Sequence, residues 1–98
     1  MSLSIRLRAL ARIEFDDAGD EYERKAPGLG PRFTRAVDKV LERIGEFPEL
    51  YGVAFRDVRC ATVRRFPYVV LYRITAEEIV VLGILPSKSD PAAWRDRD

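Results

Sequence analysis

The stretch of sequence that decides the fold is Val63-Arg64-Arg65-Phe66-Pro67-Tyr68-Val69-Val70-Leu71-Tyr72-Arg73. Its alternating side chains predict two strands, over residues 59–66 and 68–74, joined at Phe66-Pro67-Tyr68. Asp57 is the one acid in a region that holds five arginines: Arg56, Arg59, Arg64, Arg65 and Arg73. Because unpaired arginine on a half-buried sheet is costly, we expect one face of this sheet to meet water or a negatively charged partner.

Two helices are expected ahead of these strands. A short strand over residues 4–8 leads into the first helix, whose apolar stripe is Ala11, Phe15, Ala18 and Tyr22. Turn-forming residues at 27–31 separate it from a second helix, which ends before Pro48. The apolar residues of that second helix recur at spacings of three and four: Phe33, Val37, Val40, Leu41, Ile44 and Phe47. Two helices joined by such a short loop form an antiparallel hairpin.

The rest of the chain is expected to complete the sheet. Residues 79–85 are apolar on both faces, which is typical of a central strand. Residues 48–52 are predicted to be a loop anchored by Leu50 and Tyr51, and residues 87–97 a polar tail with a turn at Asp90-Pro91. We expect the second helix to pack on the sheet through Phe33, Val37, Leu41 and Ile44 against Val70, Val81 and Leu82.

The predicted fold class follows from this order of elements. It is α+β: an N-terminal strand, an antiparallel helical hairpin packed on a mostly antiparallel sheet, and a short C-terminal tail. A chain of 98 residues with 47% hydrophobic content can bury its own core, so residues 1–98 are expected to form one domain.

Composition excludes several kinds of site. The chain has a formal net charge of +1, one cysteine, Cys60, and no histidine. Serine and cysteine triads that use histidine, and histidine zinc sites, are therefore excluded. The acids of residues 14–23 are expected to form a solvated helix face without a metal. No apolar run approaches the roughly 20 residues of a membrane span, so no membrane partner is expected. The single cysteine fits a reducing cytoplasm, where we expect the protein to act, and no cofactor is expected.

Four short motifs give the chain a family resemblance. They are the Pro-Gly-Leu-Gly turn before Arg32-Phe33, the segment Phe47-Pro48-Glu49-Leu50-Tyr51, the hairpin Arg65-Phe66-Pro67-Tyr68, and Asp90-Pro91 followed by Trp94. In this order, over about residues 12–95, the chain resembles the RelE/ParE toxin superfamily, and its ParE-like branch more closely. The resemblance implies a toxin of a type II toxin–antitoxin, or plasmid-stabilisation, system with a small cognate antitoxin as partner.

The resemblance implies one of two activities. RelE-like toxins cut messenger RNA on the ribosome, whereas ParE-like toxins are associated with inhibition of DNA gyrase. Many relatives carry a His-x-Arg-Arg-Asp-Pro segment where this chain has Pro86-Ser87-Lys88-Ser89-Asp90-Pro91, and no obvious general base remains. We therefore expect growth inhibition by binding gyrase. The alternatives are a ribosome-dependent endoribonuclease using Arg64, Arg65 and Lys88, and an inactive homologue that binds only its antitoxin. Direct binding of nucleic acid is left open.

Two sets of residues are predicted to contact partners. The set expected to contact the cellular target, gyrase or ribosome, is Arg59, Arg64, Arg65, Lys88, Trp94 and Arg95. The antitoxin is expected to contact Ile13, which lies off the apolar stripe, and Arg73. Simpler alternatives remain for both sets: the sheet arginines can pair with the acidic helix, and Trp94 can fasten the tail to the domain.

Overall fold

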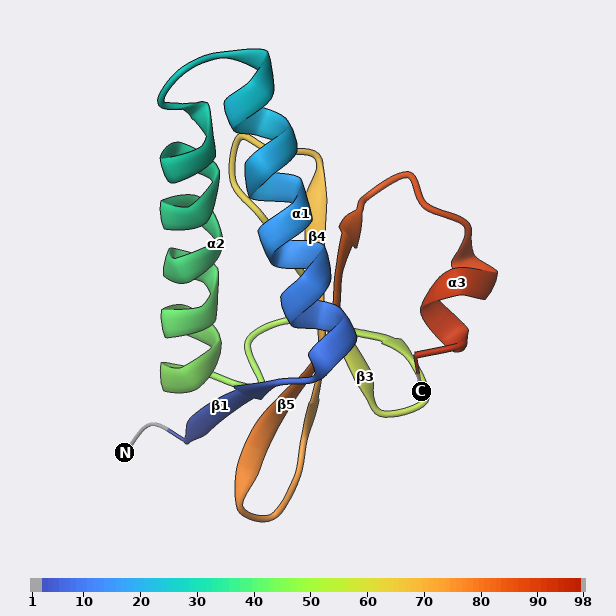
Figure 1. Cartoon of the computed structure of the whole chain (residues 1–98). Coiled ribbons are helices and arrows are strands. Elements are labelled where there is room, and N and C mark those ends of the chain that lie inside the picture. The colour runs from blue at the N-terminus through green and yellow to red at the C-terminus, as the bar shows by residue number, and fades with distance from the viewer. Residues whose placement is uncertain (1–2, 98) are drawn as a thin grey trace.

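In the computed structural model, which describes residues 3–97, a helical hairpin lies on one face of a five-stranded sheet (Figure 1). The elements in chain order are β1 (Ser4–Leu7), α1 (Ala9–Lys25), α2 (Leu29–Glu46), β2 (Val53–Phe55), β3 (Val58–Thr62), β4 (Tyr68–Ile74), β5 (Glu78–Pro86) and α3 (Pro91–Arg95). The predicted α+β class is confirmed.

The sheet has the strand order β1-β5-β4-β3-β2. β1 pairs in parallel with β5, and the other neighbours pair antiparallel, so β5 is a central strand as predicted. The β4–β5 hairpin runs from the pair Tyr68–Pro86 to the pair Ile74–Ile79, and Thr75 closes it through hydrogen bonds to Glu78. Strands 59–66 and 68–74 were expected to meet at Phe66-Pro67. The first in fact ends at Thr62, so Arg64 and Arg65 belong to a turn.

Two apolar clusters fill the two sides of the sheet. Under the hairpin, Phe33, Val37 and Ile44 of α2 are fully buried in one cluster with Val70 and Val81. The prediction that Leu82 joins them is wrong, because alternate residues of β5 point to opposite faces. Leu82 belongs to the second cluster, with its neighbours on the far face: Val58, Val69, Leu71, Val80 and Leu85.

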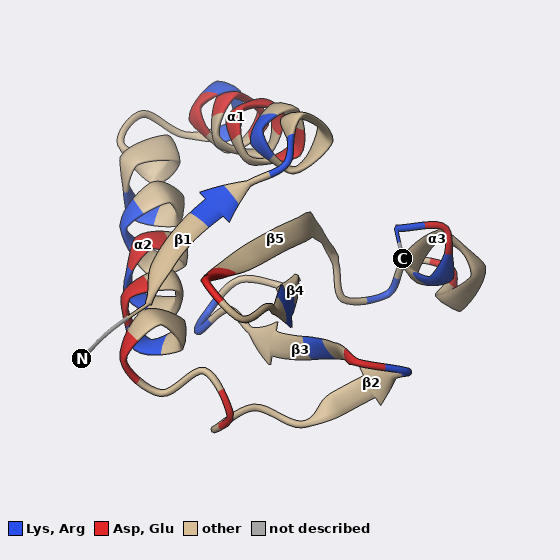
Figure 2. Cartoon of the chain, turned by 90° about the horizontal axis from the view of Figure 1, so that it is seen from below, with Lys and Arg blue, Asp and Glu red and all other residues tan. Residues whose placement is uncertain are grey.

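The far cluster is closed by a short helix that the sequence analysis took for a turn in a polar tail. Asp90 accepts a hydrogen bond from the Ala92 amide at 2.9 Å, and Pro91 occupies the first turn, so the two residues begin α3. Trp94 packs against the second cluster, and its indole Nε1 donates to Ser89 Oγ at 2.6 Å. Figure 2 shows α3 on the opposite side of the sheet from the two long helices.

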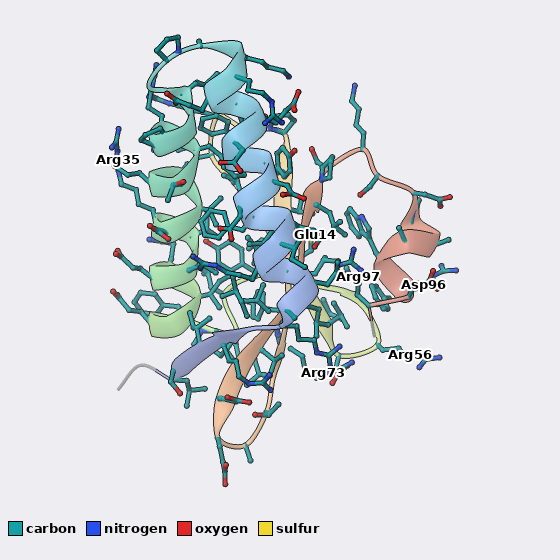
Figure 3. The ribbon with its side chains drawn as sticks, in the orientation of Figure 1. Glu14, Arg35, Arg56, Arg73, Asp96 and Arg97 are labelled. Carbon is teal, nitrogen blue, oxygen red and sulfur yellow. The ribbon has the colours of Figure 1, made fainter. Side chains whose placement is uncertain are left out.

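The predicted acidic face of α1 is not uniformly solvated. Glu23 accepts hydrogen bonds from the amides of Gly28 and Gly30 at 3.0–3.1 Å, and so caps α2. Glu14 is mostly buried and pairs with Arg97 (Figure 3). Gly30 lets the helices approach closely, since a Cβ there would lie 2.8 Å from the Gly19 carbonyl oxygen.

Several predicted anchors are more exposed than expected. Phe47 and Leu50 are 54% and 55% exposed, and Leu41 is only partly buried. Helix α2 ends at Glu46, so Phe47 lies outside the apolar stripe of the helix. Val53, in the strand β2 that was not predicted, is also exposed. Tyr51 does anchor the loop, with its ring edge-on to Tyr72.

Candidate functional site: a cationic groove beside the second helix

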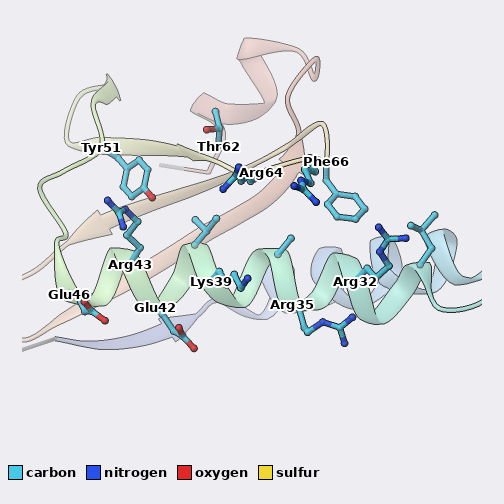
Figure 4. Close-up of a pocket in the computed structure, with 14 residues that line it drawn as sticks. Arg32, Arg35, Lys39, Glu42, Arg43, Glu46, Tyr51, Thr62, Arg64 and Phe66 are labelled. Carbon is cyan, nitrogen blue, oxygen red and sulfur yellow. The ribbon is translucent and has the colours of Figure 1, made fainter.

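A groove of about 850 Å³ runs between α2 and the turn that joins β3 to β4 (Figure 4). One wall is the outer surface of α2, from Leu29 to Glu46, and the other is formed by Thr62, Arg64, Arg65 and Phe66 with Tyr51 at one end. The turn that carries Arg64 and Phe66 faces α2 across the groove (Figure 4).

Cationic side chains line both walls. Arg32, Lys39 and Arg43 recur on one face of α2, and Arg64 lies across the groove from them (Figure 4). Arg65, the next residue of the turn, also lines the groove. All five are exposed, and within residues 3–97 none makes a hydrogen bond or an ion pair. Arginines that pair with acids within residues 3–97 lie outside the groove and include Arg6, Arg12, Arg24, Arg73 and Arg97. The groove therefore gathers more positive than negative charge, and these five cations form no ion pair within residues 3–97.

The outer lip of the groove carries both signs of charge. Arg35, Glu42 and Glu46 lie along α2 and point away from the strands (Figure 4). The carboxylates of Glu42 and Glu46 are thus placed at the edge of the cationic surface and not within it. A partner with acids at its centre and a base at its margin would match this arrangement.

The floor of the groove is apolar, and its aromatic rings are already engaged. Ala36 and Val40 lie between the cationic residues of α2. The Phe66 ring contacts the rings of Tyr22 and Phe33, with centroids 5.1 and 5.3 Å away, and its edge-to-face packing joins it to the core. The Tyr51 ring packs edge-on against Tyr72.

Arg65, which lines the groove, has an unusual backbone conformation. Its φ is +71°, in the left-handed region that favours glycine, and one other non-glycine residue of the described chain, Arg56 at +49°, shares this sign. Arg56 lies in the β2–β3 turn, outside the groove. Non-glycine residues in this region carry backbone strain, and such strain is often found at functional sites.

The predicted target contacts are divided between two places. Arg64 and Arg65 lie in the groove, but Arg59 does not line it, because its guanidinium donates to the carbonyl oxygens of Glu49 and Tyr51. Lys88 and Arg95 are exposed on the C-terminal segment, on the α3 side. That segment is tied to the β3–β4 turn by the Ser87 amide, which donates to the Pro67 carbonyl at 2.9 Å.

The predicted antitoxin contacts differ from each other in surroundings. Ile13 is 54% exposed, near Leu10, which is 49% exposed on the same helix. Arg73 is mostly buried, and its guanidinium pairs with Asp57 at 2.9 Å. Arg73 therefore pairs with an acid of the β2–β3 turn, whereas one of the simpler alternatives expected the sheet arginines to pair with the acidic helix.

The cations of α2 are the part of the groove that sequence reasoning missed. Arg32, Lys39 and Arg43 are seven and four residues apart, a spacing that places them on one face of a helix. That spacing is present in the sequence, but the five arginines of residues 56–73 form a denser group of positive charge around the strands.

Among residues 3–97, no cluster of three or more potential metal ligands is present. Within the same range, no helix is both long and apolar enough to cross a membrane. Burial raises the pKa of Tyr72, which lies behind the groove, to about 12, so its hydroxyl remains a hydrogen-bond donor, here to the Pro48 carbonyl.

The sequence and the fold both match known toxins. Residues 5–91 match the family model of the ParE toxin of the type II toxin–antitoxin system parDE. The toxin ParE2 of Mycobacterium tuberculosis, in strains CDC 1551 and H37Rv, is 33% identical over 91 residues, which span 90% of this chain and 87% of the relative. A solved chain of the chromosomal ParDE system of P. aeruginosa superposes with a TM-score of 0.76 at 19% identity, covering 87% of this chain and 96% of that one. The chain belongs to the ParE toxin family of type II toxin–antitoxin systems.

Proposed function

We propose that this toxin acts in the cytoplasm by binding a protein target, DNA gyrase, and that a cognate antitoxin neutralises it. The observation that carries the proposal is the groove, in which Arg64 and Arg65 form no ion pair within residues 3–97 and face an apolar floor and a lip of mixed charge. Protein surfaces offer matching combinations of acids, apolar side chains and occasional bases. The family to which the chain belongs is named for a two-protein system, which supports an antitoxin partner.

The groove supports binding better than hydrolysis. Arginine guanidinium groups remain protonated in proteins and cannot take a proton from a 2′-hydroxyl. The chain has no histidine, and the two carboxylates of the groove, Glu42 and Glu46, point away from its cationic interior (Figure 4). The remaining hydroxyl groups, of Tyr51 and Thr62, are donors and weak bases at neutral pH.

A supercoiling assay with purified gyrase tests the proposal. The native chain is expected to inhibit supercoiling, and the double substitution R64Q/R65Q to weaken inhibition at least tenfold, since two charge-assisted contacts are removed. R6Q is the matched control, because Arg6 lies on β1 at the far edge of the sheet and pairs with Glu78. Normal supercoiling in the presence of saturating native chain, which is also toxic in growth assays, would exclude gyrase as the target.

The C-terminal segment is proposed as a second contact with the target. Lys88 and Arg95 are exposed there and have no ion pair within residues 3–97. Point substitutions K88Q and R95Q are better tests than a truncation, because deletion after Pro91 also removes the packed Trp94 and the paired Arg97. Each is expected to reduce toxicity without lowering the melting temperature. Trp94 packs against the second cluster, and its contact with the target stays a prediction.

A ribosome-dependent endoribonuclease is the second candidate, favoured by the pair Arg64–Arg65, whose planar guanidinium groups suit phosphate. Codon-specific cleavage in a reconstituted translation reaction, lost in R65Q or K88Q, would establish it over the binding model. An inactive homologue is the third possibility, and it would bind antitoxin but leave growth unchanged.

A further inference from the structure

We infer that the groove between α2 and the β3–β4 turn accepts helix α1 from a second copy of this chain. The part of α1 that enters is its outer stripe, five exposed residues on one side of the helix: Leu10, Ile13, Asp17, Glu21 and Arg24. None of the groove-lining residues belongs to α1, so one copy presents both surfaces at once. The association itself does not depend on the proposed function, and only its effect on activity rests on that function.

Spacing gives the first argument. The outer stripe of α1 advances by three, four, four and three residues, steps that keep its members on one side of a helix. Adding 22 to each of its residue numbers gives five residues of α2 that line the groove: Arg32, Arg35, Lys39, Arg43 and Glu46. Each stripe has a length of about 21 Å, as set by the helical rise. Two such helices lying side by side therefore bring all five pairs to the same level.

Charge gives the second argument. With the two helices parallel, Asp17 of one copy lies at the level of Lys39 of the other, and Glu21 at the level of Arg43. Both acids and both bases are exposed. A carboxylate that approaches a lysine or arginine in this way forms a charge-assisted hydrogen bond. The contact therefore supplies acids to two groove cations that form no ion pair within residues 3–97.

The end of the stripe matches the lip of the groove. Arg24 lies at the level of Glu46, so the base at the margin of α1 meets a carboxylate at the margin of the groove. Within one chain, Arg24 pairs with Glu21 at 2.6 Å, but the two side chains are 68% and 58% exposed. An ion pair so exposed contributes little, and exchanging it for contacts between copies costs little.

The apolar end of the stripe gives the third argument. Leu10 and Ile13 are 49% and 54% exposed. Ile13 falls at the level of Arg35, next to Ala36, which belongs to the apolar floor of the groove. Leu10 falls at the level of Arg32, whose aliphatic stem can cover an apolar neighbour. The association thus covers two large apolar side chains that a single copy leaves exposed to water.

Charge also sets the direction of the incoming helix. The steps of the two stripes read the same forwards and backwards, so spacing alone permits an antiparallel arrangement. In that arrangement Arg24 meets Arg32, and Leu10 meets Glu46. Like charges repel, and an apolar side chain leaves a carboxylate unpaired, so the parallel arrangement is favoured.

Charge exchange between Asp17 and Lys39 is the most direct test. D17K and K39E each place two like charges at the same level, and both positions are exposed, so the fold is expected to persist. A mixture of D17K and K39E restores opposite charges between unlike copies. D38K is the matched control, because Asp38 is exposed on α2 but does not line the groove.

The experiment measures self-association by sedimentation velocity over a series of toxin concentrations, with thermal melts of every variant. The native chain and D38K are expected to associate with affinities within about twofold of each other. D17K and K39E alone should associate about tenfold more weakly or worse, and their equimolar mixture should recover the native affinity. Added salt should weaken the native association, since its ion pairs are exposed at the rim.

The pair Glu21–Arg43 provides a second exchange that also reports direction. A mixture of E21K and R43E restores this pair only in the parallel arrangement, because in the antiparallel one Glu21 meets Arg35. Recovery in this mixture supports the inference as stated. Recovery in the mixture of D17K and K39E alone overturns the parallel arrangement.

A supercoiling assay measures the effect on activity. D17K keeps every groove residue and, as a monomer, has its groove free. It is therefore expected to inhibit gyrase at a lower concentration than the native chain does. Equal inhibition by the two proteins, at concentrations where the native chain is associated, would show that the groove is not blocked in the assembly.

The remaining outcomes separate this inference from the proposed function. A native chain that stays monomeric, or single variants that associate as the native chain does, overturns the inference, and gyrase inhibition by the same protein leaves the proposed function standing. Single variants that lose association without recovery on mixing show that Asp17 and Lys39 do not meet, which also overturns it. A native chain that associates as expected but does not inhibit gyrase overturns the proposed function alone.

Discussion

Glu14 and Arg97 lie 83 positions apart in the sequence and meet at the edge of β5 that β1 leaves uncovered. Each of the two side chains is 17% exposed, and Arg97 Nη2 lies 2.5 Å from Glu14 Oε2. The Glu14 carboxylate also accepts from the Ile84 amide at 3.1 Å, and Arg97 donates to the Leu82 carbonyl at 3.2 Å. Since β1 pairs with β5 only as far as Val81, this ion pair satisfies backbone groups that a longer strand would have bonded.

Loss of the Glu14 carboxylate is therefore expected to destabilise the domain. E14A leaves the Ile84 amide without its acceptor and the mostly buried Arg97 guanidinium without its carboxylate partner, at a cost of about 1–3 kcal/mol in the free energy of unfolding. Urea titration gives the measurement. D17A, one turn away on the exposed face of α1, is the control and should change stability by less than about 0.5 kcal/mol. Equal effects would show that the β5 edge is not held by Glu14.

Two glycines in the helical hairpin should respond to alanine in opposite ways. G30A places a Cβ 2.8 Å from the Gly19 carbonyl oxygen, so the helices must separate and the melting temperature should fall. In G19A the nearest atom is Thr34 Oγ1 at 3.7 Å, an ordinary contact. That substitution should therefore stabilise the domain by about 0.5–1 kcal/mol through helix propensity. A stabilised G30A would mean that the close approach at this crossing is not constrained.

Ile44 and Leu41, both on α2, are buried to different extents. Ile44 is completely buried, and I44A should cost about 2–5 kcal/mol in unfolding free energy because the cavity is not refilled. Leu41 packs on the edge of the same cluster and keeps part of its side chain exposed, so L41A should cost less. Paired denaturant titrations measure both values. A larger loss for L41A would contradict the orientation of α2.

Because of Tyr72, the free energy of unfolding of the domain is expected to fall at alkaline pH. Burial raises its pKa to about 12, while the unfolded phenol loses its proton near pH 10, so the folded state favours the neutral form. Its contribution is complete below pH 10 and is lost as the pH rises to about 12, by about 2–3 kcal/mol at most. Unfolding free energies from pH 9 to 12, compared with Y72F, isolate the effect. Identical slopes for the two proteins would argue that another group controls alkaline unfolding.

The fold was predictable where periodicity is strong. The α1 stripe of Ala11, Phe15 and Ala18 is buried, and the apolar run 79–85 forms most of the central strand. Short elements with weak periodicity were missed: β2 has three residues, and α3 is recognisable mainly through its Asp90-Pro91 start. The exposure of Phe47 depends on where α2 ends, and hydrophobicity alone does not reveal that.

The candidate site was predictable only in part, because its walls come from segments far apart in the sequence. Arg64 and Arg65 were identified from local charge, and their turn brings them to the groove. Arg59, on β3, carries the same charge, but its guanidinium donates hydrogen bonds to two backbone carbonyls. Which arginines remain uncompensated depends on tertiary contacts that no sequence window contains.

The parallel pairing of β1 with β5 has a consequence for the order of folding. Arg6 and Glu78, partners across this pair, are 72 positions apart, whereas the α1–α2 and β4–β5 hairpins join neighbouring segments. Closing so long a loop is entropically expensive before other contacts form. We therefore expect β1 to dock after the rate-limiting step, so that substitutions at Ile5 accelerate unfolding and leave the folding rate nearly unchanged.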